Sequence, residues 1–234
     1  MIEVVVKFGG SLSRGAGLQK LCRQLAGLGR QHRLLVVPGG GSFADTVRDY
    51  DKCYGLSNAT AHWMAILAMD QYGYLLSDLI PHSQAVRNLE AANKIALARR
   101  VPVLLPFDLI RQADSLPHSW EVTSDSISAW VAQSAGAAKL VLLKDVDGLY
   151  SEAHPGEGES DLLESLTLEQ LANCEGVDRF LAAVVGDSCL DLWIINGNEP
   201  HRLEELLAKG KTRGTCYQRC ISSSAGPFHD PQSR

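Results

Sequence analysis

Short apolar runs along the chain alternate with longer segments in which apolar residues recur at helical spacing. The runs are typical of buried strands and lie at residues 2–6, 34–37, 103–105, 139–143 and 192–195. Helices are predicted over residues 18–28, 58–79 and 123–135. Of three further predicted helices, one begins near residue 42, one ends at residue 100 and one begins at residue 199. The alternation predicts an α/β fold, a single three-layer αβα sandwich with a mostly parallel central sheet.

The loop after the first predicted strand carries residues suited to phosphate binding. Lys7 ends the strand, and Gly9, Gly10 and Ser11 follow it. Ligands of parallel sheets bind beyond the carboxyl ends of the strands. There a lysine ammonium, closely approaching glycine N–H groups and a hydroxyl can hold a phosphate. The same residues also fit a tight turn with a solvated lysine.

A second glycine turn, Gly39-Gly40-Gly41-Ser42, follows the second predicted strand. Because each glycine raises the entropy cost of folding, a backbone that lies against a ligand would explain three in succession. A sharp turn is the alternative. Gly39, Gly41 and Ala44 also fit the dinucleotide-binding fingerprint, but that motif needs an acidic residue about 20 positions later at a strand end, where a helix is predicted. A dinucleotide-dependent oxidoreductase has only this motif in its favour.

Two further polar segments lie at the start of a predicted helix and after a predicted strand. Thr123-Ser124-Asp125-Ser126 opens a predicted helix, where Asp125 either caps the helix or holds a catalytic lysine. Lys144 to Tyr150 follows the fourth predicted strand and forms either a charged turn or a nucleotide site in which Lys144 meets phosphates.

The segment Gly210-Lys211-Thr212 resembles the end of a P-loop. Glu205 stands where a P-loop needs glycine, and a helix rather than a strand is predicted before it. The sequence therefore excludes this nucleotide-binding motif.

The histidines carry less information than the glycine turns. His118 lies with Ser119 and Trp120 in a predicted loop and is the histidine best placed to contact a substrate. His62 falls on an apolar helix and is expected to pack in the core or at an interface. No spacing of histidine, cysteine and carboxylate residues indicates a metal site, and no Gly-x-Ser-x-Gly motif indicates a hydrolase.

The composition indicates which class of protein the chain belongs to, which partners are not expected and which cellular compartment it suits. The chain has 234 residues, of which 45% are hydrophobic and 21% charged, as in ordinary globular proteins. A net charge of −5 without a basic stripe argues against a nucleic-acid partner. Six cysteines without a Cys-x-x-Cys pair favour reduced thiols and a cytoplasmic protein. The longest apolar region, residues 180–195, contains Asp187 and Asp191, so no membrane partner is expected.

The order of these motifs resembles the amino acid kinase family, over about residues 2–217. A Lys-x-Gly-Gly-Ser strand end, a Gly-Gly-Gly strand end, a Ser-Asp-Ser helix start and a Lys-x-Val-Asp-Gly-x-Tyr strand end follow one another. The resemblance implies a carbamate kinase-like fold, a domain over residues 1–220 and a flexible tail over 221–234. Residues 151–160 are predicted to form a flexible surface loop. The resemblance also implies ATP, Mg²⁺, a small-molecule substrate and a homo-oligomer.

The resemblance assigns roles residue by residue. Lys7 would contact the transferring γ-phosphoryl group, and Asp125 would orient Lys7. The residues implied on the nucleotide and phosphate side are Gly9, Gly10, Ser11, Lys144, Asp147, Gly148, Tyr150, Lys211, Gly214 and Thr215. Those implied on the acceptor side are Gly39, Gly40, Gly41, Ser42, Arg48, His118, Ser119, Trp120 and Thr123.

Within the family, the segments at 39–51, 118–126 and 196–202 are similar to the branch that phosphorylates an (aminomethylfuranyl)methyl phosphate in methanofuran-type one-carbon cofactor biosynthesis. Relatives carry a Gly-Gly-Met-x-x-Lys segment whose lysine assists transfer. Residues 176–180 stand there in this chain, so Arg179 or Lys144 is the candidate second cation.

The expected reaction converts ATP and a small phosphate monoester into ADP and a diphosphate. An isoprenoid acceptor is disfavoured, because Phe43, Ala44 and Asp45 replace a histidine that isopentenyl phosphate kinases carry after the triple glycine. The alternatives are a family kinase with uridylate or an amino-acid carboxylate as acceptor, and a non-catalytic ATP-binding or storage protein on the same fold.

Overall fold

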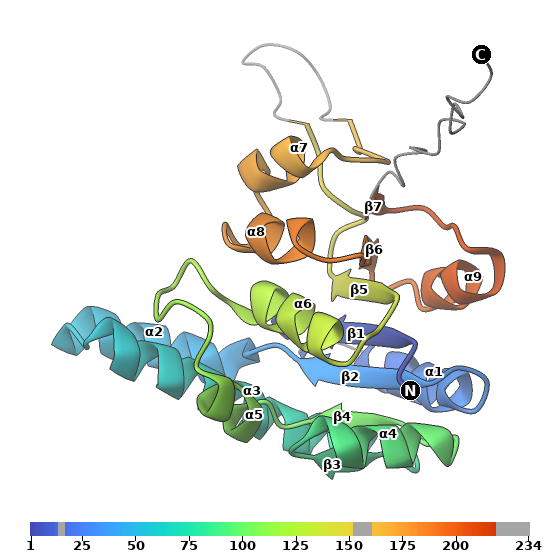
Figure 1. Ribbon diagram of the computed structural model, residues 1–234, viewed down its shortest axis with the longest axis horizontal. Coiled ribbons are helices and arrows are strands. Elements are labelled where there is room, and N and C mark those ends of the chain that lie inside the picture. Colours follow the sequence, from blue (N-terminus) through green and yellow to red (C-terminus); the bar gives the residue numbers. More distant parts are fainter. Residues whose placement is uncertain (14–16, 152–160, 219–234) are drawn as a thin grey trace, which may run out of the picture.

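A mostly parallel sheet forms the centre of the computed structural model, which describes residues 1–13, 17–151 and 161–218. Within these residues seven strands follow the order β3-β4-β2-β1-β5-β6-β7 (Figure 1). All neighbours pair in parallel except β7, which runs antiparallel to β6. The strands are β1 Val4–Phe8, β2 Leu34–Pro38, β3 Gln84–Val86, β4 Pro102–Leu104, β5 Lys139–Lys144, β6 Asp191–Asn196 and β7 Thr215–Tyr217.

Helices cover both faces of this sheet, which confirms the three-layer αβα sandwich (Figure 1). Side chains of β1 alternate between the two cores: Val5 packs with residues of α6 and α8, whereas Val6 and Phe8 pack with residues of α1 and α9. The helical elements are η1 Gly10–Ser13, α1 Leu18–Gly29, α2 Gly41–Tyr54, α3 Asn58–Leu79, α4 Leu89–Leu97, α5 Phe107–Ala113, α6 Ser124–Ser134, α7 Leu168–Asn173, α8 Leu181–Gly186 and α9 His201–Lys209.

The strand register brings the predicted site residues to one edge of the sheet. Lys7 pairs with Val37 of β2 and with Leu142 of β5, near the carboxyl ends of all three central strands. The glycine turn after β2 and the Lys144 end of β5 therefore lie on either side of Lys7. Central parallel strands are buried on both faces, which is why β1, β2 and β5 read as continuous apolar runs.

Short elements were not predicted from the sequence. Strands β3 and β7 have three residues each, and helices α5, α7 and α8 have seven or fewer, too few to show a period. Helix α4 ends at Leu97 rather than at residue 100. The expected flexible loop lies almost wholly, and the C-terminal tail entirely, outside the described residues. No helix in the described ranges is long and apolar enough to cross a membrane.

Candidate active site

One buried carboxylate joins the two strand-end lysines. Lys7 Nζ lies 2.9 Å from Asp125 Oδ1, and Lys144 Nζ lies 2.8 Å from Asp125 Oδ2. The three residues come from the end of β1, the first turn of α6 and the end of β5. The side chains of Lys7 and Asp125 are 6% and 5% exposed, and that of Lys144 is 15% exposed.

The electrostatics of this cluster favour an anionic ligand. Burial alone would raise the pKa of Asp125, but the two ammonium groups outweigh it and hold the pKa well below its usual range. Burial lowers the pKa of Lys7, and the Asp125 carboxylate opposes that change. Two ammonium groups share one contacting carboxylate, so a further negative charge at this place would be stabilised.

The two glycine turns pack against each other, backbone to backbone. A Cβ atom on Gly10 would lie 2.6 Å from the Gly41 nitrogen, and one on Gly39 would lie 2.9 Å from the Gly10 nitrogen. Gly41 has a φ of +54°, which disfavours other residues. The fold itself therefore requires these glycines, a reason that differs from the ligand contact expected from the sequence.

Hydrogen bonds within the fold use some of the predicted phosphate donors. The N–H of Gly9 donates to the Leu143 carbonyl at 3.0 Å, and the N–H of Gly39 donates to the Phe8 carbonyl at 2.8 Å. The Gly9 N–H, predicted to donate to a phosphate, thus has the Leu143 carbonyl as its partner in this structure. Helix α2, by contrast, begins at Gly41 without a side-chain cap, and the first N–H groups of a helix have no partner within it.

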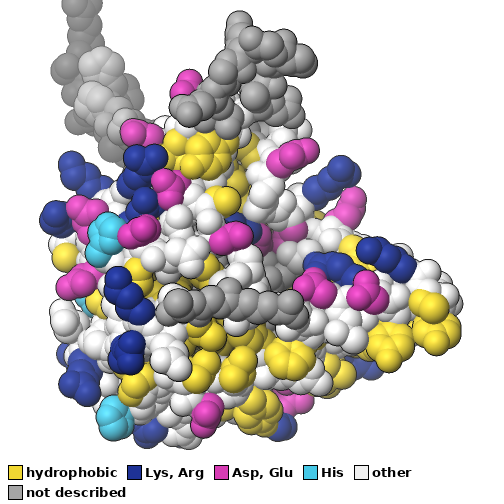
Figure 2. All heavy atoms as spheres, turned by 180° about the vertical axis from the view of Figure 1, so that it is seen from behind, with side chains coloured by type: hydrophobic (Ala, Val, Ile, Leu, Met, Phe, Trp, Pro, Cys, Tyr) yellow, Lys and Arg dark blue, Asp and Glu magenta, His cyan; other side chains and the backbone are white. Residues whose placement is uncertain are grey.

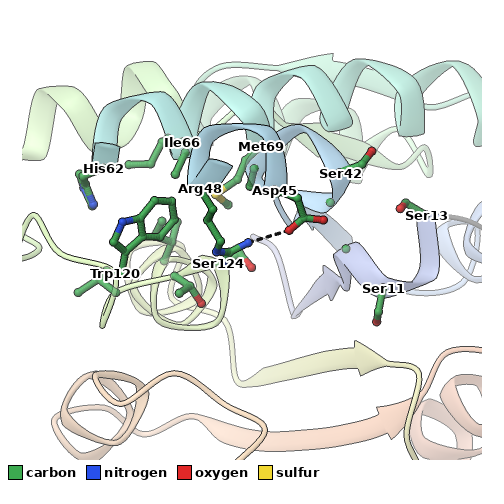
Figure 3. A pocket seen from close by; sticks show the side chains of 18 of the residues that line it. Ser11, Ser13, Ser42, Asp45, Arg48, His62, Ile66, Met69, Trp120 and Ser124 are labelled. Carbon is green, nitrogen blue, oxygen red and sulfur yellow. Dashed lines mark hydrogen bonds and ion pairs between the residues drawn. The ribbon is translucent and has the colours of Figure 1, made fainter. Parts of the chain in front are cut away.

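The start of α2 opens into a cavity of about 410 Å³ (Figure 3). Helices α2 and α3 form one wall of this cavity, and the loop before α6 with the start of α6 forms the other. Its end near Lys7 is lined by small polar groups, Gly10, Ser11, Ser13, Gly40, Gly41 and Ser42. Its far end is lined mainly by larger side chains, including His62, Ile66, Met69, Trp120, Val122 and Ile127.

Trp120 forms part of the cavity wall and is held by neighbouring side chains. Its indole N–H donates to Asp51 Oδ2 at 2.7 Å, and the Arg48 guanidinium lies 5.0 Å from the centre of its ring. Arg48 in turn donates to Asp45 Oδ1 at 2.9 Å (Figure 3). The structure thus brings Arg48, Ser119, Trp120 and Thr123 to the cavity as the sequence predicted, together with Asp45, which was not predicted to contact substrate.

His118 lies behind the cavity rather than in its lining. Its ring stacks on His62 with 4.8 Å between ring centres, and its Nε2 lies 2.7 Å from Asp114 Oδ1. His62 is buried, as the sequence predicted, and it also lines the cavity. Burial, together with the neighbouring His118, lowers the pKa of His62 to about 4, so its ring is neutral near pH 7.

Asp147 organises a separate polar cluster beside β6. It accepts hydrogen bonds from Asn196 at 2.9 Å and Arg202 at 2.7 Å, and Arg213 Nε lies 3.0 Å from its other oxygen. These hydrogen bonds, first that from Arg202, lower the pKa of Asp147 to about 2. The sequence resemblance placed Asp147 on the nucleotide side, and the structure gives its carboxylate these protein partners.

The remaining predicted nucleotide residues divide into buried and exposed positions. Thr215 is 1% exposed, and its hydroxyl accepts from the Leu149 N–H at 2.7 Å. Gly148 and Gly214 are buried, whereas Tyr150 and Lys211 are exposed. The Ser11 hydroxyl, a predicted phosphate donor, donates to Asp145 Oδ1 at 2.9 Å.

The structure separates the two candidates for the second cation. Lys144 shares Asp125 with Lys7, as described above. The Arg179 side chain is 84% exposed and lies 3.9 Å from Glu121 Oε1. It borders a second hollow of about 510 Å³, which Asp125 also lines. Proximity to Lys7 therefore favours Lys144.

The helix that carries Asp125 is capped by a residue that the sequence did not single out. Asp178 accepts hydrogen bonds from the N–H groups of Thr123 and Ser126, at 3.0 and 2.9 Å. The N-terminus of α6 thus holds a carboxylate of this chain. Asp178 lies 52 residues from Ser126, and no local signal links them.

Magnesium fits this site only as a companion of a phosphate ligand. Among the described residues, no group of three histidine, cysteine, aspartate or glutamate side chains could hold a metal ion. Mg²⁺ commonly keeps several waters and uses one or two carboxylates plus substrate phosphates. The donor set is compatible with Mg²⁺ that arrives with ATP.

Buried lysines that share a carboxylate, beside glycine turns and an uncapped helix start, are the features of a phosphoryl-transfer site. The comparisons agree with this class, an ATP-dependent phosphotransferase. The model of the amino acid kinase family matches residues 3–200, and the chain belongs to this family.

Relatives within the family have more than one acceptor. The chain is 28% identical over 205 residues to [5-(aminomethyl)furan-3-yl]methyl phosphate kinase of Methanocaldococcus jannaschii, with 87% of this chain and 92% of the relative covered. It is 24% identical to uridylate kinase of Pyrococcus abyssi, with 86% and 90% covered. The crystal structure of uridylate kinase from Archaeoglobus fulgidus has the same fold, with a TM-score of 0.72, 21% identity and 92% and 100% coverage.

Proposed function

We propose that this protein transfers the γ-phosphoryl group of ATP to a small phosphate monoester and so forms a diphosphate. One observation carries the proposal. The Lys7–Asp125–Lys144 cluster lies at the sheet edge beside a cavity that is polar near the cluster and apolar farther away. A phosphate monoester with a compact apolar or ring-shaped tail matches that gradient.

The donor side of the proposed reaction uses the two lysines. Their ammonium groups neutralise charge that spreads over the equatorial oxygens of the transferring group. Asp125 holds both ammonium groups in place, because each of its oxygens contacts a different lysine. The nucleotide then extends from Lys144 toward the segment from Asp147 to Tyr150.

The acceptor side uses the start of α2. Its uncapped N–H groups and the positive end of the helix dipole favour an anion there. The side chains of Ser42 and Ser13 border the same end of the cavity. An acceptor phosphate at this place lies between the helix start and Lys7, which is the position required for attack on the γ-phosphorus.

The reaction needs no general base. An oxygen of the anionic acceptor phosphate attacks the γ-phosphorus of ATP, a new P–O–P bond forms, and the bond to the β-phosphate oxygen breaks to release ADP. No proton must leave the nucleophile, in agreement with a site built from cations and backbone N–H groups.

The acceptor we favour is an (aminomethylfuranyl)methyl phosphate, in methanofuran-type one-carbon cofactor biosynthesis. The Methanocaldococcus relative acts on [5-(aminomethyl)furan-3-yl]methyl phosphate. The flat Trp120 ring, Ile66 and Met69 supply an apolar surface suited to a five-membered ring. Asp45 lines the same cavity, where it is paired with Arg48. A neutral His62 does not repel a protonated amine.

We further propose that Mg²⁺ accompanies ATP, that the protein is cytoplasmic and that it forms a homo-oligomer. Free thiols at Cys22, Cys53 and Cys216 suit a reducing compartment. Hydrophobic side chains gather at the end of the molecule that α2 and α3 form (Figure 2). The exposed hydrophobic residues of these two helices include Tyr50, Tyr54, Leu67, Tyr74 and Leu75. Light scattering after size exclusion tests whether copies associate.

The proposed reaction is tested by ADP release with Mg-ATP and a panel of acceptors. The panel contains the furan phosphate, UMP, isopentenyl phosphate, aspartate and acetylglutamate. We expect turnover with the furan phosphate and a new diphosphate signal in ³¹P NMR. Turnover with UMP alone would support the lysine mechanism and would show that the acceptor is uridylate rather than the furan phosphate. An acyl phosphate trapped by hydroxylamine would overturn the phosphate-acceptor proposal.

A further inference from the structure

A carboxylate from a distant segment holds the first turn of α6. Asp178 accepts from the N–H and hydroxyl of Thr123 at 3.0 and 2.8 Å, and from the N–H of Ser126 at 2.9 Å and the hydroxyl of Ser126. Thr123 stands at the N-cap position, yet its own side chain makes no capping bond. One carboxylate from elsewhere in the chain therefore does the work that a local cap normally does.

These four hydrogen bonds bracket Asp125. Thr123 and Ser126 lie two positions before and one position after Asp125, so the bonds fix the backbone on both sides of it. Asp125 is 3% exposed and must reach Lys7 and Lys144 with separate oxygens. A small rotation of this turn would lengthen both ion pairs, because each oxygen faces a different lysine.

The segment around Asp178 is tied to the same region by a further contact. The N–H of Phe180 donates to the Glu121 carbonyl at 3.3 Å. Asp178 and Asp125 both border the second hollow, together with Gly176 and Arg179. The residues around Asp178 and the start of α6 thus form one wall next to the lysine cluster. The negative charge of Asp178 also favours the ammonium form of Lys7.

We infer that Asp178 is a positioning residue for phosphoryl transfer, which acts by fixing Asp125 against the two lysines. The inference rests on the proposed function, in which Lys7 and Lys144 stabilise the transferring group. It assigns a catalytic consequence to a residue that touches neither lysine, and it predicts that Asp178 affects the rate of transfer more than the binding of substrates.

The variant Asp178→Asn tests this inference. An amide offers one acceptor oxygen and a donor NH₂ group, so it cannot accept all four bonds. We expect kcat to fall on the order of 10²-fold while KM for ATP and for the acceptor changes less than about threefold. The matched control is Asn88→Ala, since Asn88 caps α4 by accepting from the Ala91 N–H at 2.8 Å, far from the lysines. The Asn88→Ala control should also lose a helix cap, but its kcat should equal that of the wild type.

A double-mutant cycle separates positioning from general loss of structure. In an Asp125→Asn background, Asp178→Asn should lower kcat less than about threefold further, because its effect passes through Asp125. Independent, multiplicative losses would overturn the inference. If Asp178→Asn does not fold, Ser126→Ala removes one hydroxyl bond and leaves the carboxylate. A several-fold fall in kcat is expected there, and an unchanged kcat would overturn the inference.

Two outcomes distinguish this inference from the proposed function. Full activity of Lys7→Ala would refute the lysine mechanism itself. The positioning role alone would be refuted by a different pair of results. In that case Lys7→Ala is inactive, and Asp178→Asn has the same kcat as the Asn88→Ala control. A readout without turnover is the NMR signal of the buried ammonium groups. Those of Lys7 and Lys144 should broaden through faster exchange in Asp178→Asn, and unchanged signals would contradict the inference.

Discussion

Removing the charge of Asp125 should destabilise the protein and at the same time make ATP a stronger stabiliser. Asp125→Asn leaves Lys7 and Lys144 side by side without the carboxylate that contacts both. Breaking a buried ion pair by removing one partner costs about 3–5 kcal/mol. Lys144 is partly exposed and can turn toward water, so we expect a loss of about 3 kcal/mol, or a Tm lowered by about 6–12 °C in a chain of this size.

The assay is thermal unfolding with and without saturating Mg-ATP. The triphosphate supplies the missing negative charge in the variant, whereas in the wild type it must share the lysines with Asp125. The rise in Tm on adding ATP should therefore be larger for Asp125→Asn, even though its kcat falls about 10²–10³-fold.

A control for this experiment is Asp191→Asn, which removes a more exposed ion pair with Lys139 at 3.4 Å. Such pairs contribute about 1 kcal/mol or less. The reasoning is refuted if Asp125→Asn costs no more than Asp191→Asn, or if ATP stabilises the wild type and Asp125→Asn equally.

Three further predictions concern single residues. Lys7→Ala should lower kcat about 10³-fold or more with a nearly unchanged circular dichroism spectrum, since Lys144 still pairs with Asp125; an active variant would contradict this. Asp147→Asn should lower the unfolding free energy at pH 7 by about 2 kcal/mol. Because the pKa of Asp147 is lowered from 3.8 to about 2, this difference should shrink as pH falls from 4 toward 2 in urea titrations, and a constant difference would count against it. The pKa of His62 is lowered to about 4 from 6.5, so the wild type should lose stability as pH falls from 6.5 to 4, and a His62→Gln variant with the same Tm–pH profile would disprove the assignment.

The central sheet and the lysine cluster could be predicted because their signals are local. Buried parallel strands read as apolar runs, and the lysine, glycine and aspartate residues stand directly at strand ends or a helix start. Lys7 and Asp125, which the family resemblance implies are partners, are 2.9 Å apart in the structure. Strand ends meet at one edge of a parallel sheet, which predicts that Lys7 and Lys144 lie at the same edge. The pairing of Lys7 with Asp125 was implied by the family resemblance.

Other features of the site depend on contacts between segments that are distant in the sequence, and no local sequence pattern predicts them. The cap by Asp178 spans 52 residues, and the close approach of Gly10 to Gly41 joins two turns that are separate in the sequence. His118, expected to contact substrate, is held behind the cavity by Asp114, whereas the buried His62 packs as expected and also lines the cavity. Residue type alone does not show which side of a loop faces the ligand.

The most direct test of the account is ³¹P NMR of the products formed from Mg-ATP and [5-(aminomethyl)furan-3-yl]methyl phosphate, with Lys7→Ala as the paired sample. The account predicts equal amounts of ADP and a new diphosphate ester with the wild-type protein, and neither with the variant. ADP without a diphosphate ester, or the same products from Lys7→Ala, would contradict it.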